Sequence, residues 1–144
     1  MATLHYPAIC RQEPDGRVTV RFPDLPGAVT DGADAAEAYA EAIDCLGSYI
    51  SVSMARKEPI PSASVAKGRQ RLIPVPLWIA PKFALYQTMM RQAVTNRELA
   101  RRLGVTEAVI RRMLDPEHAS KPGKIEIALA ALRQRISLTL EDAA

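Results

Sequence analysis

The stretch that most constrains the fold is TNRELARRLGVTEAVIRRML, residues 95–114 of the 144-residue chain. Thr95 and Glu98 stand three residues apart, the spacing of a capping box, so a helix is predicted to begin just after Thr95. Gly104 follows the last apolar residue of that helix, where the chain must turn sharply and glycine tolerates positive φ. Thr106 is placed to cap a second helix. Two short helices joined through a tight glycine turn form a helix-turn-helix, and we predict that motif here.

The apolar residues of this stretch have the spacing needed to hold the two helices together. Leu99 and Leu103 fall on one side of the first helix, and Ile110 and Met113 fall on one side of the second. Ala100 is small at the point where the helices must approach closely. A helical hairpin that binds nothing would carry the same anchors, so the choice between the two interpretations depends on the residues left outside.

Those outer residues have the chemistry of a DNA-binding surface. In helix-turn-helix folds the N-terminal end of the second helix enters the major groove. Arginine pairs with phosphate or with guanine edges, and glutamate accepts a hydrogen bond from cytosine, so Glu107 is expected to discriminate between bases. Arg102 could equally well be a solvated surface residue. The residues expected to contact DNA are Asn96, Arg97, Arg101, Thr106, Glu107, Ala108, Arg111 and Arg112.

Charge is divided unevenly between the two halves of the chain. Residues 1–55 contain three basic and eight acidic residues, a net charge of −5, and residues 56–144 contain 16 basic and eight acidic residues, a net charge of +8. Such a split suggests two surfaces that meet partners of opposite sign. The basic half suits phosphates, and the acidic half suits a basic protein.

The acidic half is predicted to form strands before it forms a helix. Residues 3–23 alternate apolar and polar positions around the turn PDGR, a pattern typical of a hairpin. A third strand is expected around residues 28–30. Asp34 has the position of a helix cap, and the helix that follows should end near Lys57 because prolines come next.

Two proline-containing stretches follow that helix. Residues 59–71, PIPSASVAKGRQR, are polar and are expected to form a mobile loop. The next stretch, LIPVPLWI, is strand-like, and Pro74 and Pro76 place their missing N–H groups along the same side, which suits an edge strand. The predicted order is β-β-β-α-β, which gives a small α+β domain over residues 1–77.

Residues 78–144 are predicted to form a second, all-α domain that contains the helix-turn-helix. Pro81 and Pro122 each stand at the start of a helical pattern, a position that the proline ring favours. The chain closes with RISLTLE, in which Ile136, Leu138 and Leu140 alternate with polar residues. A short C-terminal strand is therefore predicted there.

No enzyme site is recognisable in the sequence. Its two cysteines lack metal-ligand or redox spacing, and its two histidines, His5 and His118, lie in different halves. A two-metal carboxylate site would need acids such as Asp24, Asp31 and Asp34, but Asp34 is placed to cap a helix and Asp31 stands in a turn. No glycine loop of the kind that cradles phosphate is present. We therefore expect no catalysis, no cofactor and no bound metal.

The sequence also lacks the features of an exported or membrane protein. Its first residues meet charges and prolines before an apolar signal core could form. No apolar run approaches the ~20 residues that a membrane-spanning helix needs. A soluble protein in the reducing cytoplasm is expected.

Residues 22–42, FPDLPGAVTDGADAAEAYAEA, resemble the corresponding region of HicB-type antitoxins. The resemblance lies in a strand that ends in Phe-Pro-Asp-Leu-Pro-Gly, a threonine and a glycine shortly after it, and a helix rich in alanine and glutamate. It continues through PIPSAS and RLIPVPL to the C-terminal LARRLGV and LDPEHAS. The turn DGADAAEA departs from the Gly-Asp-Thr that family members often have, and Asp34 is expected to take over the capping there.

The resemblance implies a specific function without catalysis. It implies an N-terminal fold like a partial ribonuclease H that lacks a working active site. It implies a small, basic, HicA-like mRNA interferase toxin as partner, which the antitoxin neutralises by steric occlusion. It also implies repression of the protein's own operon by a C-terminal domain that, over residues 80–135, resembles those of Cro and phage repressors. Such domains bind operators as dimers, so a homo-oligomer, either a dimer or a tetramer, is expected.

The toxin-binding surface is less clearly marked than the DNA-binding surface. Its candidate residues belong to the FPDLPG motif and are Phe22, Asp24, Leu25 and Pro26. These residues could instead serve only to shape the turn between two strands. Two other functions stay open from the residues alone: a ligand-sensing helix-turn-helix repressor, and a ribonuclease H-like nuclease in which Asp24 would be needed for metal-dependent cleavage.

Overall fold

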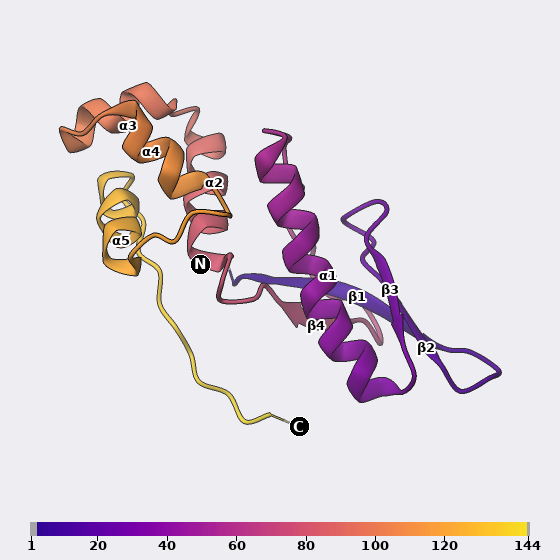
Figure 1. Cartoon of the computed structure of the whole chain (residues 1–144). Coiled ribbons are helices and arrows are strands. Elements are labelled where there is room, and N and C mark those ends of the chain that lie inside the picture. The colour runs from indigo at the N-terminus through magenta and orange to yellow at the C-terminus, as the bar shows by residue number, and fades with distance from the viewer. Residues whose placement is uncertain (1–2, 144) are drawn as a thin grey trace. The chain divides into compact units, whose positions relative to one another are not determined.

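In the computed structural model, the N-terminal part of the chain forms an antiparallel sheet covered by one long helix (Figure 1). The structure describes residues 3–143. It divides into two compact units, residues 1–80 and residues 81–144, and each unit is described by itself.

The sheet contains four strands in the spatial order β3-β2-β1-β4. Their bounds are β1 His5–Gln12, β2 Val18–Arg21, β3 Val29–Gly32 and β4 Arg71–Pro74, and all neighbouring pairs are antiparallel. The predicted order β-β-β-α-β and the edge position of β4 are confirmed. The third strand begins at Val29 rather than Ala28, because the Ala28 N–H closes the FPDLPG turn onto the Leu25 carbonyl at 3.0 Å.

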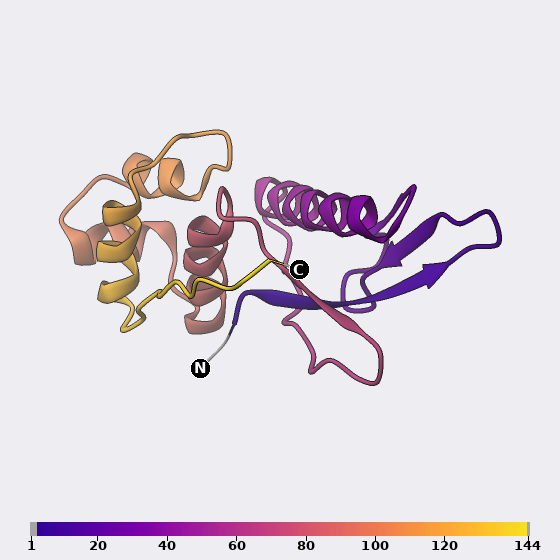
Figure 2. The same cartoon turned by 90° about the horizontal axis from the view of Figure 1, so that it is seen from below.

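Helix α1, Ala35–Ala55, runs along one face of this sheet (Figure 2). Asp34 is its cap as predicted, since the Asp34 side chain accepts a hydrogen bond from the Glu37 N–H at 2.9 Å. A side chain at Gly47 would meet Pro76 at 2.6 Å and the ring of Trp78 at 2.7 Å, so this position of the helix must stay small. The absence of a side chain there lets the segment after β4 lie against α1.

Residues 59–70 form an extended strap that carries the chain from the end of α1 back to β4. The sequence predicts a mobile loop here, yet hydrogen bonds hold the strap to β1 and to the turn between β2 and β3. The Tyr6 hydroxyl donates to the Pro61 carbonyl at 2.7 Å, and Asp24 accepts hydrogen bonds from the N–H and the hydroxyl of Ser64 at 2.8 Å and 3.0 Å. Ile60 is buried. These contacts let β4 enter the sheet antiparallel to β1.

Over the described residues, the second unit is built from four helices: α2 Ala80–Gln92, α3 Asn96–Leu103, α4 Glu107–Leu114 and α5 Pro122–Ala131. They enclose one apolar core, whose buried members are Leu85, Met89, Leu99, Ala100, Ile110, Met113, Ile125, Ala128, Leu129 and Leu132. The helices expected from the sequence are therefore present.

The C-terminal strand predicted over RISLTLE is wrong for the described residues. Residues 134–143 contain no strand, and Figure 1 draws this segment as an extended tube. Leu138 and Leu140 are 78% and 99% exposed. Alternating apolar residues form a strand only when a neighbouring strand satisfies the backbone, and within residues 3–143 no strand pairs with this segment.

Candidate functional site

The pair of helices α3 and α4 has the turn geometry that residues 95–114 predict. Gly104 adopts the left-handed conformation, with φ 66° and ψ 34°. The Val105 N–H then donates to the Ala100 carbonyl at 3.0 Å, which closes the end of α3. Leu99, Ala100, Ile110 and Met113 are all buried, as their spacing predicts.

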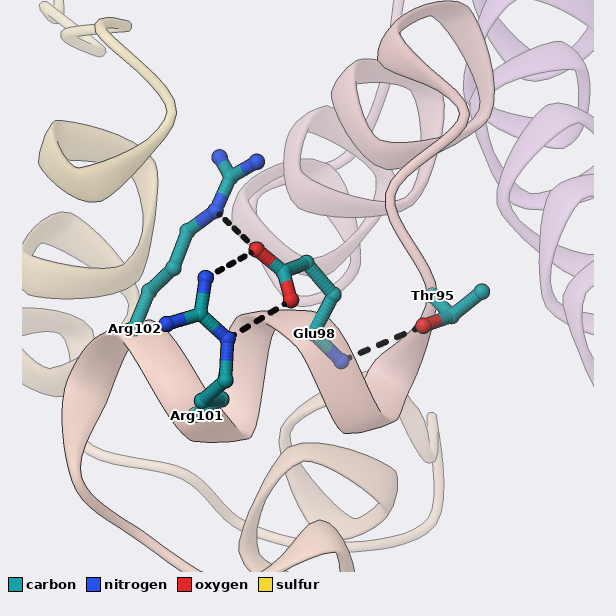
Figure 3. Close-up of polar contacts among 4 residues, drawn as sticks. All are labelled: Thr95, Glu98, Arg101 and Arg102. Carbon is teal, nitrogen blue, oxygen red and sulfur yellow. Dashed lines mark hydrogen bonds and ion pairs between the residues drawn. The ribbon is translucent and has the colours of Figure 1, made fainter.

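The two predicted helix caps differ in the structure. The Thr95 hydroxyl accepts a hydrogen bond from the Glu98 N–H at 3.1 Å, which confirms the first cap (Figure 3). Thr106 has the extended backbone of a cap residue, with φ −79° and ψ 158°, but its side chain makes no capping hydrogen bond. The prediction that the Thr106 side chain caps α4 is therefore wrong.

Glu98 binds two arginines of its own helix instead of closing the capping box. Its carboxylate accepts hydrogen bonds from Arg101 at 2.6 Å and 2.9 Å and from Arg102 at 3.0 Å (Figure 3). These two guanidinium groups lower the pKa of Glu98 to about 2. Arg101, an expected DNA contact, is thus paired with an internal acid, and Arg102 shares that acid.

Glu107 links the two helices. Its carboxylate pairs with Arg111 at 3.0 Å within α4 and accepts a hydrogen bond from the Asn96 amide of α3 at 3.4 Å. Arg97 and Arg112 are exposed and form no ion pair with any described residue. The structure therefore brings Asn96, Glu107 and Arg111 together and leaves Arg97 and Arg112 available.

Lys82 of α2 holds the C-terminal end of α4 in place, a role that the sequence did not predict. Its side chain is buried, with 5% of the residue exposed, and its ammonium group donates to the Arg112 carbonyl at 3.1 Å, the Asp115 carbonyl at 2.7 Å and the Ser120 hydroxyl at 3.0 Å. Burial lowers the pKa of Lys82. The lysine ties the end of α4 and the loop after it to α2. Nothing in the local sequence distinguishes it from a surface lysine.

The FPDLPG motif buries its two large apolar side chains in the N-terminal unit and leaves Pro23, Pro26 and Gly27 exposed. Phe22 and Leu25 are buried in the core, and Asp24 holds Ser64 of the strap. Of the candidate toxin contacts, Pro26 is exposed and Asp24 is partly exposed. This arrangement favours a structural role for the larger side chains of the motif.

The three acids that could have formed a two-metal site each bind a different partner within the N-terminal unit. Asp24 binds the strap, Asp34 caps α1, and Asp31 pairs with Arg17 at 2.7 Å. Among residues 3–143, no group of three or more histidine, cysteine, aspartate or glutamate side chains is arranged to hold a metal ion. His118 contacts Ser120 at 3.3 Å in the C-terminal unit, far along the chain from His5 on β1.

Comparison with known proteins places the chain in a family. Residues 5–84 match the family described as HicB-like antitoxin of bacterial toxin–antitoxin systems. The chain is 33% identical over 137 residues to Antitoxin HicB of Escherichia coli (strain K12), which covers 95% of this chain and 99% of that protein. It is 35% identical over 135 residues to Antitoxin HicB 2 of Photorhabdus laumondii, covering 94% and 95% of the two chains. A third relative, Antitoxin HicB of Pseudomonas fluorescens, is 31% identical over 141 residues, 97% of this chain and 96% of its own length.

The chain therefore belongs to the HicB-like antitoxin family of bacterial toxin–antitoxin systems. The similarity to the curated relatives extends over both units and is not confined to the N-terminal one. None of the helices over residues 3–143 has the length and apolar character required to cross a membrane.

Proposed function

We propose that this protein is an antitoxin that neutralises a HicA-like mRNA interferase by steric occlusion and represses its own operon through α3 and α4. The observation that carries the proposal is the similarity to HicB antitoxins over nearly the whole chain. The geometry of the two units supports one activity for each. Neither activity requires catalysis.

The operator-binding activity is assigned to α3 and α4, which act as a helix-turn-helix. The left-handed Gly104 and the buried anchors fit this motif, and at the N-terminal end of α4 Thr106 is exposed and Glu107 and Ala108 are partly exposed. In such motifs the second helix enters the major groove, which would present Glu107, Ala108 and Arg111 to base edges. Arg97 and Arg112 are available for phosphates or bases. The wider unit would then be a repressor-like domain working as a dimer or tetramer, because half-sites repeat in operators.

The toxin-binding activity is assigned to the N-terminal unit. Its fold would be a partial ribonuclease H without a working site, and the separate use of Asp24, Asp31 and Asp34 fits that assignment. Residues 1–55 carry a net charge of −5, which complements a basic toxin and speeds its capture. Occlusion needs only that the antitoxin cover the toxin's catalytic residues.

The test uses the full-length protein with two partners measured separately. The first is a HicA-like toxin encoded beside the gene, purified as an inactive variant; co-purification as a stable complex is expected. The second is a duplex fragment of the protein's own promoter, and retardation that weakens steeply with added salt is expected, since phosphate contacts release counterions. Failure to bind either partner would overturn the proposal for the corresponding unit.

A further inference from the structure

The two edges of the sheet differ in whether they can accept another strand. In an antiparallel sheet, alternate residues direct their N–H and C=O groups to opposite sides of the strand. The Val75 N–H donates to the Leu4 carbonyl at 2.8 Å, so odd-numbered residues of this segment face β1. Pro74 and Pro76 therefore face outward, and neither has an N–H to donate. The outer edge of β4 is closed to a new strand.

The outer edge of β3 lacks this protection. The Phe22 N–H donates to the Ala28 carbonyl at 3.1 Å, and Val20 pairs with Thr30, so even-numbered residues of β3 face β2. Val29 and Asp31 consequently direct their backbone groups away from the sheet. Val29 is 61% exposed, and β3 is the last strand on this side among the described residues.

Acidic side chains line this edge. The Cys45 thiol of α1 donates to the outward Val29 carbonyl at 3.9 Å, which places that side of α1 beside β3 and leaves the Val29 N–H and the backbone groups of Asp31 for a new strand. Glu37 and Glu41 precede Cys45 by two turns and one turn of the helix, so they lie on the same side of it. Asp31 also lies on this edge, but its carboxylate pairs with Arg17 at 2.7 Å, so Glu37 and Glu41 supply the negative charge that no ion pair offsets among the described residues.

We infer that the outer edge of β3 binds an extended basic segment of the toxin, which adds a fifth strand to the sheet. The inference rests on the proposed toxin-binding function. Main-chain hydrogen bonds at the Val29 N–H and at the backbone groups of Asp31 give the segment its register, and lysine or arginine side chains on it face Glu37 and Glu41. A second copy of this chain is disfavoured as the occupant, because pairing two β3 edges would bring like charges together.

The first experiment removes the outward N–H of Val29 without changing the inner ladder. Val29→Pro is expected to weaken capture of the inactivated HicA-like toxin at least about tenfold, because a proline on an edge strand blocks the added strand. Val29→Thr keeps the N–H and the branched shape, and it is expected to bind as the wild type does. Both variants are compared in titration calorimetry after thermal unfolding has established that they fold.

A second measurement does not depend on the proline variant folding. Hydrogen exchange of wild-type protein is expected to show the amides of Val29 and Asp31 exchanging quickly in the free protein and slowly in the complex. The Leu72 amide on the opposite edge should be unaffected. The charge-matched variants Glu37→Gln/Glu41→Gln and Glu117→Gln/Glu126→Gln separate local from global electrostatics: only the first should slow association and flatten its salt dependence.

The possible outcomes separate the proposed toxin binding from the inference that the toxin binds at the β3 edge. Wild-type protein that captures no toxin would overturn both the proposed toxin binding and this inference. Capture that survives Val29→Pro at full affinity, with unprotected amides at 29 and 31, would overturn the inference alone.

Discussion

The two units of the protein hold their charged residues in different ways. On α1, Glu37, Glu41 and Asp44 are exposed and form no ion pair with any described residue. On α3 and α4, by contrast, Glu98 and Glu107 hold three of the arginines that give the C-terminal half its positive charge. Counting residues gives the sign of each surface, but internal contacts decide how much of that charge a partner meets.

The largest expected effect separates the activities of the two units. Arg111→Ala/Arg112→Ala is expected to weaken promoter binding roughly 100-fold, because each arginine contact to DNA contributes about 1–3 kcal/mol. Toxin capture should be unchanged, since the substitutions lie outside the acidic unit. Electrophoretic retardation and calorimetry measure the two affinities on the same preparation.

A matched control removes two arginines from the segment after α5. Arg133→Ala/Arg135→Ala changes the net charge equally and should leave most of the promoter affinity intact. If both double variants lost affinity to the same extent, α4 would have no special role and only the overall charge would matter.

The next prediction tests whether Lys82, a cation of the basic C-terminal unit, stabilises the fold of that unit. Lys82→Met is expected to lower the free energy of unfolding of the C-terminal unit by about 2–3 kcal/mol, because three acceptors lose their donor. Urea denaturation measures the change. Lys124→Met, on the exposed side of α5, should have little effect. Equal stability of the Lys82 variant and the wild type would contradict the structural role.

The smallest expected effect is a gain in affinity for DNA rather than a loss. Glu98→Gln is expected to tighten binding to promoter DNA about 3- to 10-fold and to steepen its salt dependence, because Arg101 and Arg102 become available to phosphates. Binding to a scrambled fragment should tighten as much or more, so the specificity ratio falls. Glu126→Gln on α5 is the charge-matched control and should leave the salt slope unchanged.

The pH dependence of this cluster follows from the sign of its pKa shift. The folded protein holds the pKa of Glu98 at about 2, below the ordinary value of 4.5. The stabilisation is therefore fully present above pH 4.5 and disappears as the pH falls through 2. An NMR titration of the Glu98 carboxyl group checks this directly, and a midpoint near the ordinary value would show that the arginines do not hold it.

Features set by short-range chemistry were the ones that the sequence predicted well. The caps at Asp34 and Thr95, the left-handed Gly104 and the outward-facing prolines of β4 each depend on a few neighbouring residues. Where a side chain has more than one possible hydrogen-bond partner, the sequence did not predict which partner it binds. Glu98 had the spacing of a capping box, yet two arginines one turn further along compete for its carboxylate and hold it.

Features that depend on distant partners were missed or wrongly predicted. Lys82 is a hydrogen-bonding centre only because α4 and the loop to Ser120 pack around it. The alternation of Ile136, Leu138 and Leu140 is a valid strand pattern, but no strand of the described chain pairs with it. From the sequence, Asp24 was a candidate catalytic or toxin-binding acid. In the structure its carboxylate binds Ser64 of the strap, a residue 40 positions further along the chain.

The sequence by itself determined the order of strands and helices as far as α5, the position of the tight turn and the opposite charge of the two halves, because periodicity, capping and proline chemistry act over a few residues. Only the tertiary structure decided which charges remain available, which edge of the sheet is open and which part of the FPDLPG motif is exposed. These properties depend on segments that are far apart in the chain and meet only when the whole unit folds.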